Sequence, residues 1–218
     1  MKTLSLLALG LPGLAHAAVQ GFDISNWQTS VDYAGAYNAG ARFVMIKATE
    51  GTTFIDKLFN THYTGATNAG LIRGGYHYAH PDSSSGSAQA TYFLAHGGGW
   101  TGDGRTLPGM LDLENGCYGL STSEMTSWIS DFGETYKTET GRYPMLYITT
   151  SWWRECTGDD AGFGEYPLVI ARWASSPGEL PASWSAQSFW QYDDAYAFGG
   201  DSQEWNGSEE SLRVFASG

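Results

Sequence analysis

Two carboxylates separated by a single residue are the strongest chemical signal in the chain. Asp112 and Glu114 end the apolar segment 107–114, whose composition predicts a strand buried on both faces. Because side chains alternate along a strand, both carboxyl groups point to one face, about 6.6 Å apart. Their repulsion keeps one proton bound at mildly acidic pH, so a protonated acid would stand beside an ionised partner. The alternative is a pair of solvated residues at the end of a strand.

The elements that must position this pair alternate between strands and helices. We expect strands at 19–25, 42–48, 71–78, 107–114, 143–149, 167–173 and 188–192. We expect helices at 33–39, 56–69, 87–96 and 121–137, and the capping box formed by Ser121 and Glu124 opens the last of them. No full helix fits between the last two strands.

This alternation predicts the fold class α/β, with a parallel sheet and helices outside it. Seven or eight strands in about 200 residues indicate a partly degenerate (β/α)8-type barrel with reduced C-terminal helices. Active sites of such barrels lie at the C-terminal ends of the strands, which is where Asp112 and Glu114 occur. We expect residues 18–218 to form this one catalytic domain.

Two further acidic residues could reach the same end of the barrel. Asp23 lies in the first strand, where Phe22 and Ile24 alternate with it and would face the helices, so that Asp23 faces the interior. Asp201 follows a Gly-Gly pair after the last expected strand and could close the ring of carboxylates. The alternatives are a helix cap for Asp23 and a turn residue for Asp201.

Residues 1–17 have the pattern of a secretory signal peptide. Lys2 supplies the positive start, 4–14 is apolar, and Ala-His-Ala at 15–17 has the small-x-small form of a cleavage site. The apolar run is too short to span a bilayer. We therefore expect cleavage after Ala17 and a secreted, extracellular, monomeric protein with no membrane partner. Without Lys2 the formal charge becomes −13, which argues against a nucleic-acid partner.

The cysteines and tryptophans fit an extracellular protein that meets sugars. Cys117 and Cys156 are the two cysteines, and an even count in a secreted chain predicts a disulfide. Several of the nine tryptophans lie in polar, Gly-rich contexts, where a flat ring suits a sugar face. The alternative is that most of them pack the core. The tryptophans in question are Trp152, Trp153, Trp173, Trp190 and Trp205.

No cofactor or metal is expected. Gly97, Gly99 and Gly102 have the spacing of a dinucleotide-binding motif, but they follow a helix where that motif needs a strand. His77 and His80 would face opposite sides of their strand and lack a third ligand, so we interpret them as core or cleft-wall residues. A G-x-S-x-G motif, which a serine esterase would need, does not occur.

The ordered motifs of the chain resemble those of glycoside hydrolase family 25, the Chalaropsis-type lysozymes. The match runs from about Val19 to the C-terminus and is most similar to the fungal branch, because of AHGGGW at 95–100 and the two cysteines. The motifs are GFDISNWQ at 21–28, IKATEG at 46–51, GGYHY at 74–78, LDLE at 111–114 and DSQEWNG at 201–207.

The resemblance implies a muramidase that hydrolyses the β-1,4 bonds from N-acetylmuramic acid to N-acetylglucosamine in bacterial peptidoglycan. Glu114 matches the general acid of the family, and Asp112 matches its partner on the same strand. Asp23 and Asp201 match the other two acidic residues of the cleft. The resemblance and the aromatic pattern add substrate-binding candidates, which are Tyr76, Tyr147, Trp190 and Gln191.

Two other functions and several mechanisms stay open at this point. A non-catalytic wall- or chitin-binding protein and a chitinase-like glycosidase could share a barrel with carboxylates on one strand. The close D-x-E spacing, together with an N-acetyl sugar, suggests that the 2-acetamido group attacks its own anomeric carbon. Asp112 would then orient that amide while Glu114 protonates the leaving oxygen. Direct attack by water, Asp23 or Asp201 is the alternative.

Overall fold

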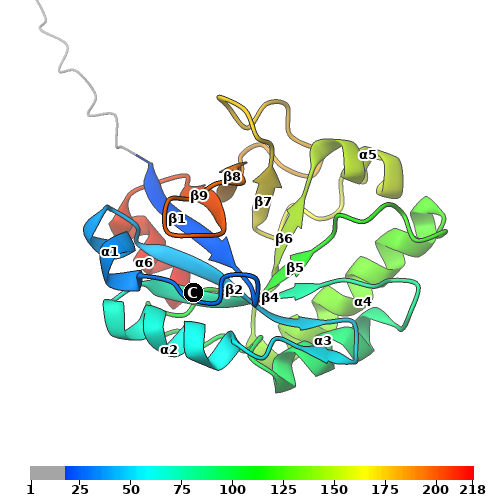
Figure 1. Cartoon of the computed structure of the whole chain (residues 1–218). Coiled ribbons are helices and arrows are strands. Elements are labelled where there is room, and N and C mark those ends of the chain that lie inside the picture. The colour runs from blue at the N-terminus through cyan, green and yellow to red at the C-terminus, as the bar shows by residue number, and fades with distance from the viewer. Residues whose placement is uncertain (1–17) are drawn as a thin grey trace, which may run out of the picture.

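The computed structural model describes residues 18–218 as a barrel of strands with helices packed around it (Figure 1). The expected signal peptide, 1–17, lies outside the described residues. The strands are β1 (Val19–Ile24), β2 (Phe43–Glu50), β3 (Phe54–Ile55), β4 (Ile72–Tyr78), β5 (Met110–Asp112), β6 (Met145–Ile148), β7 (Leu168–Ala171), β8 (Phe189–Asp193) and β9 (Asp201–Trp205). The helices are α1 (Tyr33–Asn38), α2 (Phe59–Ala69), α3 (Gly86–Ala95), α4 (Thr122–Thr140), α5 (Thr150–Thr157) and α6 (Glu209–Ser217).

Eight of these strands close into a ring. The order is β1-β9-β8-β7-β6-β5-β4-β2, and β1 pairs again with β2 to complete the barrel. The pairings from β2 through β4 to β8 are parallel, whereas β9 runs antiparallel to both β8 and β1. The short β3 folds back on the end of β2 and lies outside the ring. Closure leaves no open edge on the ring strands.

The predicted fold class is confirmed, and four elements were missed. The seven expected strands and four expected helices are present with small shifts at their ends, and no helix separates β7 from β8. β3, α5 and α6 were not expected from the sequence pattern. Asp201 was placed after the last strand, but it is the first residue of β9, because two glycines with positive φ, Gly199 and Gly200, turn the chain back against β1.

Strand alternation divides the core into an outer and an inner layer. On β5, Leu111 packs in the outer cluster beneath the helices and Met110 in the inner cluster. The inner cluster fills the lower part of the barrel with aromatic rings, and Phe189 lies 5.0 Å from Phe43 and 4.9 Å from Trp205 between ring centroids. Because α6 covers this end, polar inward residues have room only at the C-terminal ends of the strands.

The longest helix, α4, is capped at both ends and packs a buried face against the outer core. The Ser121 hydroxyl accepts a hydrogen bond from the Glu124 backbone N–H, and the Glu124 carboxylate accepts one from the Ser121 backbone N–H, as the predicted capping box requires. Its buried face carries Phe132 and Tyr136. The helix ends at Gly141, which has a φ of 88°.

Within residues 18–218, none of the helices is long and apolar enough to cross a bilayer.

The predicted disulfide is confirmed and lies beside the C-terminal end of β5. Cys117, in the loop after β5, is bonded to Cys156 in α5. The indole nitrogen of Trp152 donates a hydrogen bond of 2.9 Å to the Gly116 carbonyl. The loop that carries Glu114 is therefore fixed to α5 at two points.

We expect a large loss of stability when both cysteines are replaced by serine. The bond closes a loop across 39 residues, and a cross-link of that span contributes about 4 kcal/mol in the chain-entropy model. The melting temperature of the double variant should fall by about 10 °C in calorimetry. The folded wild-type protein should label no thiol without reductant. An unchanged melting temperature, or two reactive thiols, would contradict the assignment.

Candidate active site

A polar cavity of about 210 Å³ opens at the C-terminal ends of the strands and brings the four predicted carboxylates together. Asp23 lies on β1, Asp112 ends β5, Glu114 lies two residues after β5, and Asp201 begins β9. The other lining groups are an aromatic set and a few polar or thioether side chains. The complete lining is Asp23, Asp112, Glu114, Asp201, Trp27, Tyr76, Tyr78, Tyr147, Ser25, Lys47, Met110 and Gln191.

The two β5 carboxylates differ in their environment. Asp112 is 7% exposed, and its Oδ1 has no hydrogen-bond partner within residues 18–218. Burial raises its pKa well above the ordinary value, and the charges of Glu114 and Asp23 raise it further. Glu114 is exposed at the mouth, yet partial withdrawal of its carboxyl group from water also raises its pKa. Both groups therefore hold a proton more readily than ordinary carboxyls.

Asp23 and Asp201 face each other on neighbouring antiparallel strands. They are paired in the register of β1 and β9. Burial raises the pKa of Asp23 to about 7, and the charge of Asp201 adds to the effect. The pKa of Asp201 rises to about 6, through burial first and the nearby charge of Asp194 second. The cavity thus disfavours full ionisation of its carboxyl groups.

Gln191 connects this second pair to the aromatic wall. Its Nε2 donates hydrogen bonds to Asp23 Oδ2 at 3.0 Å and to Asp201 Oδ2 at 3.2 Å. Its Oε1 accepts from the Tyr147 hydroxyl at 2.9 Å and from the Trp173 indole at 3.1 Å. These four bonds use the whole hydrogen-bonding capacity of the amide. Gln191 lines the cavity as expected, but its amide orients protein groups and has no free donor for a sugar.

Lys47 is a lining residue that sequence reasoning missed. Its Nζ lies 2.6 Å from Glu50 Oε2, and Glu50 Oε1 lies 2.8 Å from His80 Nε2. The Lys47 charge opposes the rise in pKa of Asp112 and Glu114. The signal was available in the motif IKATEG at 46–51, where the lysine interrupts an apolar strand.

The expected role of tryptophans in the cleft holds for few of them. Trp173 is 60% exposed at the rim, and Trp27, which was not singled out, is 84% exposed and lines the cavity. Trp190 is buried in the outer core and donates its indole hydrogen to the Arg172 carbonyl. It alternates with Phe189 and Gln191, so it must point away from the interior. The remaining candidates, Trp152, Trp153 and Trp205, are also buried.

The histidines on and after β4 have the structural role expected of them. His77 is fully buried, with Thr49 Oγ1 at 2.8 Å and Gln89 Oε1 at 2.9 Å from its two ring nitrogens. Burial lowers its pKa to about 4, so the ring stays neutral at mildly acidic pH. The His77 side chain points toward the outer layer and does not reach the cavity.

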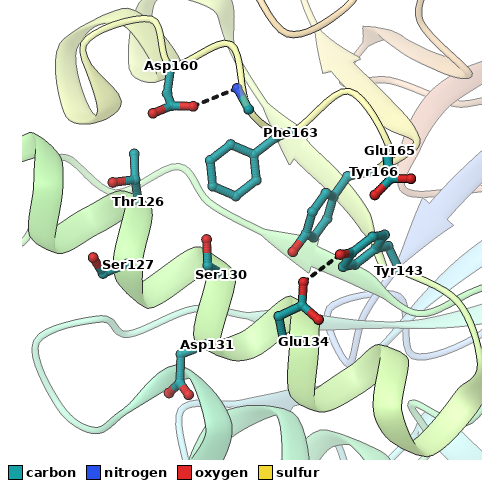
Figure 2. Close-up of a pocket in the computed structure, with 11 residues that line it drawn as sticks. Thr126, Ser127, Ser130, Asp131, Glu134, Tyr143, Asp160, Phe163, Glu165 and Tyr166 are labelled. Carbon is teal, nitrogen blue, oxygen red and sulfur yellow. Dashed lines mark hydrogen bonds between the residues drawn. The ribbon is translucent and has the colours of Figure 1, made fainter.

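A larger hollow of about 670 Å³ lies on the outer face between α4 and the segment that follows α5 (Figure 2). Figure 2 shows Glu134 accepting a hydrogen bond from the Tyr143 hydroxyl, and Asp160 accepting one from a backbone amide nearby. These carboxylates already have protein partners. None of the four cavity carboxylates lines this hollow, so the chemistry of the chain belongs to the barrel mouth.

The fold and the carboxylate cluster define a barrel enzyme of the glycoside hydrolase type. The chain belongs to glycosyl hydrolases family 25, whose family model matches residues 22–201. The N,O-diacetylmuramidase of Arthroderma benhamiae is 58% identical over 207 residues, which are 92% of this chain and 88% of that relative. The N,O-diacetylmuramidase of a Chalaropsis species is 55% identical, over 92% of this chain and 100% of its own.

A solved structure agrees with this assignment. The muramidase from Trichobolus zukalii superposes with a TM-score of 0.91 at 61% sequence identity, and the match covers 92% of this chain and 99% of that one. The resemblance inferred from the ordered motifs is thereby confirmed.

We expect the stability of the fold to decrease as the pH rises from 5 to 8. Asp23 has an ordinary pKa of 3.8 and a folded pKa of about 7, so between these values the folded chain keeps a proton that the unfolded chain releases. Stability from this group is full below pH 4 and is lost toward pH 7. The melting temperature should fall by about 5 °C over this pH interval.

Asp23→Asn, which is neutral at every pH, should flatten this dependence in differential scanning calorimetry. The matched control is Glu139→Gln on the exposed face of α4, which should keep the wild-type slope. An equal pH slope in wild type and Asp23→Asn would refute the assignment of the buried proton to Asp23.

Proposed function

We propose that this chain is a muramidase that hydrolyses the β-1,4 bonds from N-acetylmuramic acid to N-acetylglucosamine in bacterial peptidoglycan. The observation that carries the proposal is the convergence of four carboxylates with raised pKa at the mouth of a family 25 barrel. The similarity to two N,O-diacetylmuramidases and a muramidase supports the same substrate.

Glu114 is the general acid in this proposal. It lies at the exposed mouth, where a bound sugar chain can reach it, and its raised pKa favours the protonated form that a general acid needs. The disulfide and the Trp152 hydrogen bond fix the backbone that carries it. A fixed acid adds more to the rate than a mobile one, because its orientation is set before the substrate arrives.

Asp112 is the group that orients the substrate. Its buried Oδ1 lacks a protein donor within the described residues, and an unpaired buried oxygen is costly unless a ligand supplies the partner. The N–H of the 2-acetamido group is a donor of the right kind. Burial favours a proton on Asp112 in the free enzyme, so the group must lose that proton as the substrate binds. The ionised Asp112 then holds the amide in place and stabilises the positive charge that develops on it.

This arrangement supports a substrate-assisted route. The acetamido oxygen attacks C1 of muramic acid, and the C1–O4 bond breaks while Glu114 gives its proton to the departing O4. Water then adds to C1 of the oxazolinium ring, and Glu114 takes a proton back. The Gln191 amide holds Asp23 and Asp201 by their Oδ2 atoms, so a competing covalent route would have to use the Oδ1 atom of one of them.

The cellular context rests on the first residues of the chain. The signal-peptide pattern at 1–17 supports secretion, with 18–218 as the mature catalytic domain. An extracellular location would place the enzyme where bacterial walls are found and would keep the Cys117–Cys156 bond oxidised. We propose that the mature protein acts as a monomer.

We expect Glu114→Gln to reduce the turnover of peptidoglycan by at least about 100-fold, because the amide keeps the shape of the acid but cannot give a proton. The melting temperature should not change. The measurement is loss of wall turbidity, followed by analysis of which sugar carries the new reducing end. Glu139→Gln should retain full activity. A near-normal rate in Glu114→Gln, or a new reducing end on N-acetylglucosamine, would overturn the proposal.

A thiazoline analogue of the cyclised intermediate should bind about 100-fold more tightly than the product sugar, since it resembles the species next to the transition state. Asp112→Asn should remove most of that gain, because its amide carries no charge to balance the ring. Isothermal titration measures both affinities. A covalent adduct on Asp23 or Asp201, trapped with a fluorinated substrate and found by mass spectrometry, would exclude the substrate-assisted route.

A further inference from the structure

The catalytic cavity continues into two further hollows along the barrel rim. A hollow of about 310 Å³ shares Glu114, Tyr147 and Gln191 with the cavity. A third hollow of about 790 Å³ shares Arg172 with the second, along with Thr149 and Ala171. Together they form one groove that leads from the general acid across the ends of β6 and β7.

The balance of charge differs between the two ends of the groove. The catalytic end holds four carboxylates, and the far end holds two arginines, Arg154 and Arg172, with one carboxylate, Glu155. Lys47 is paired with Glu50, and Arg154 lies 2.8 Å from Glu179. Of the three cations that line the groove, Arg172 alone has no carboxylate within 4 Å in the described part of the chain.

The Arg172 guanidinium is held in place with one edge unused. Its Nη1 donates to the Ser176 carbonyl at 2.8 Å and lies 3.3 Å from the Ser176 hydroxyl. A Cβ atom at Gly178 would lie 2.8 Å from Nη1, so any larger residue at this position would crowd the guanidinium. Nε and Nη2 make no hydrogen bond within residues 18–218. That edge has the geometry that binds a carboxylate through two parallel hydrogen bonds.

The distance along the rim fits a substituent of muramic acid. Asp112 pairs with Tyr147 and Tyr147 with Val169, so Glu114 and Ala171 lie at one height, two strand spacings apart. Two spacings are about 10 Å. The lactyl group of muramic acid carries a short peptide, and the lactyl unit followed by L-alanine and D-glutamate spans about 10 Å when extended. The α-carboxylate of D-glutamate is the first free anion on this path.

We propose that Arg172 binds the α-carboxylate of the peptide stem on N-acetylmuramic acid and makes the groove selective for glycan strands with an anionic stem. The inference rests on the proposed muramidase function and adds the part of the substrate that this groove takes. Trp173, exposed beside Arg172, lines the same hollow and gives the stem an apolar wall.

The test compares two defined oligosaccharides of N-acetylglucosamine and N-acetylmuramic acid. Both carry L-alanine followed by a D-glutamyl unit whose γ-carboxyl is capped as a methylamide. In the glutamate substrate the α-carboxylate is free, and in the isoglutamine substrate it is an amide. The wild-type enzyme should show a kcat/KM about 10-fold higher on the glutamate substrate. Arg172→Gln should lose that advantage through KM and should cleave the isoglutamine substrate at the wild-type rate. Arg172→Lys, which keeps the charge but not the fork, should fall between them.

Arg105→Gln is the matched control, because Arg105 is an exposed arginine that lines none of the three hollows. It should keep the full preference of the wild type. An equal loss on both substrates in Arg172→Gln would show a structural role and overturn the inference, as would a wild type with no preference. A wild type that cleaves neither substrate would overturn the proposed function and the inference with it.

Discussion

The closed ring of strands imposes one constraint on every inward side chain: it must either fill the interior or stand at an open end. In the lower half of the barrel the inward positions carry Phe43, Phe189 and Trp205, which pack against one another. In the upper half they carry carboxylates and amides. The boundary between these two zones on β5 is one alternation step, from Met110 to Asp112. The catalytic cluster exists because the aromatic packing stops at that level.

The same constraint makes the carboxylates costly to the fold. Four acidic groups share one small cavity, and burial raises the pKa of each of them. The Gln191 amide reduces this cost for Asp23 and Asp201 by donating to both. On the β5 side, Asp112 Oδ1 has no equivalent donor within the described residues. This difference in hydrogen bonding between the two pairs of carboxylates is the physical basis for assigning them different roles in the reaction.

The fold class and the four carboxylates could be predicted because they depend on local patterns. A buried strand that ends in D-x-E fixes the direction of both side chains, whatever surrounds it. Asp23 followed from the same parity through Phe22 and Ile24. The capping box of α4 was equally local. The resemblance to family 25 then indicated that these predicted residues belong to one site.

The remaining features depend on contacts between distant segments. Trp190 sits in a sequence that suits a cleft, but the register of β8 with β7 and β9 decides which way its ring points. Trp27 and Lys47 join the cavity because their strand ends converge in space. The antiparallel β9 could not be read from 201–205 alone, because its polar alternation becomes a strand pattern only when β1 and β8 lie beside it. Sequence periodicity contains no information of that kind.

The position of β9 has a consequence for folding during synthesis on the ribosome. β1 leaves the ribosome before the other strands, yet one of its edges is completed only by the segment Asp201–Trp205, the last strand to be made. Until then the nascent sheet is an open arc with Asp23 at its free margin, and Gln203, which donates to that carboxylate, does not yet exist. Pairings of such long range close slowly. The acid cluster is therefore completed only after all the other strands have been made, so a fragment that ends before β9 has no complete acid cluster.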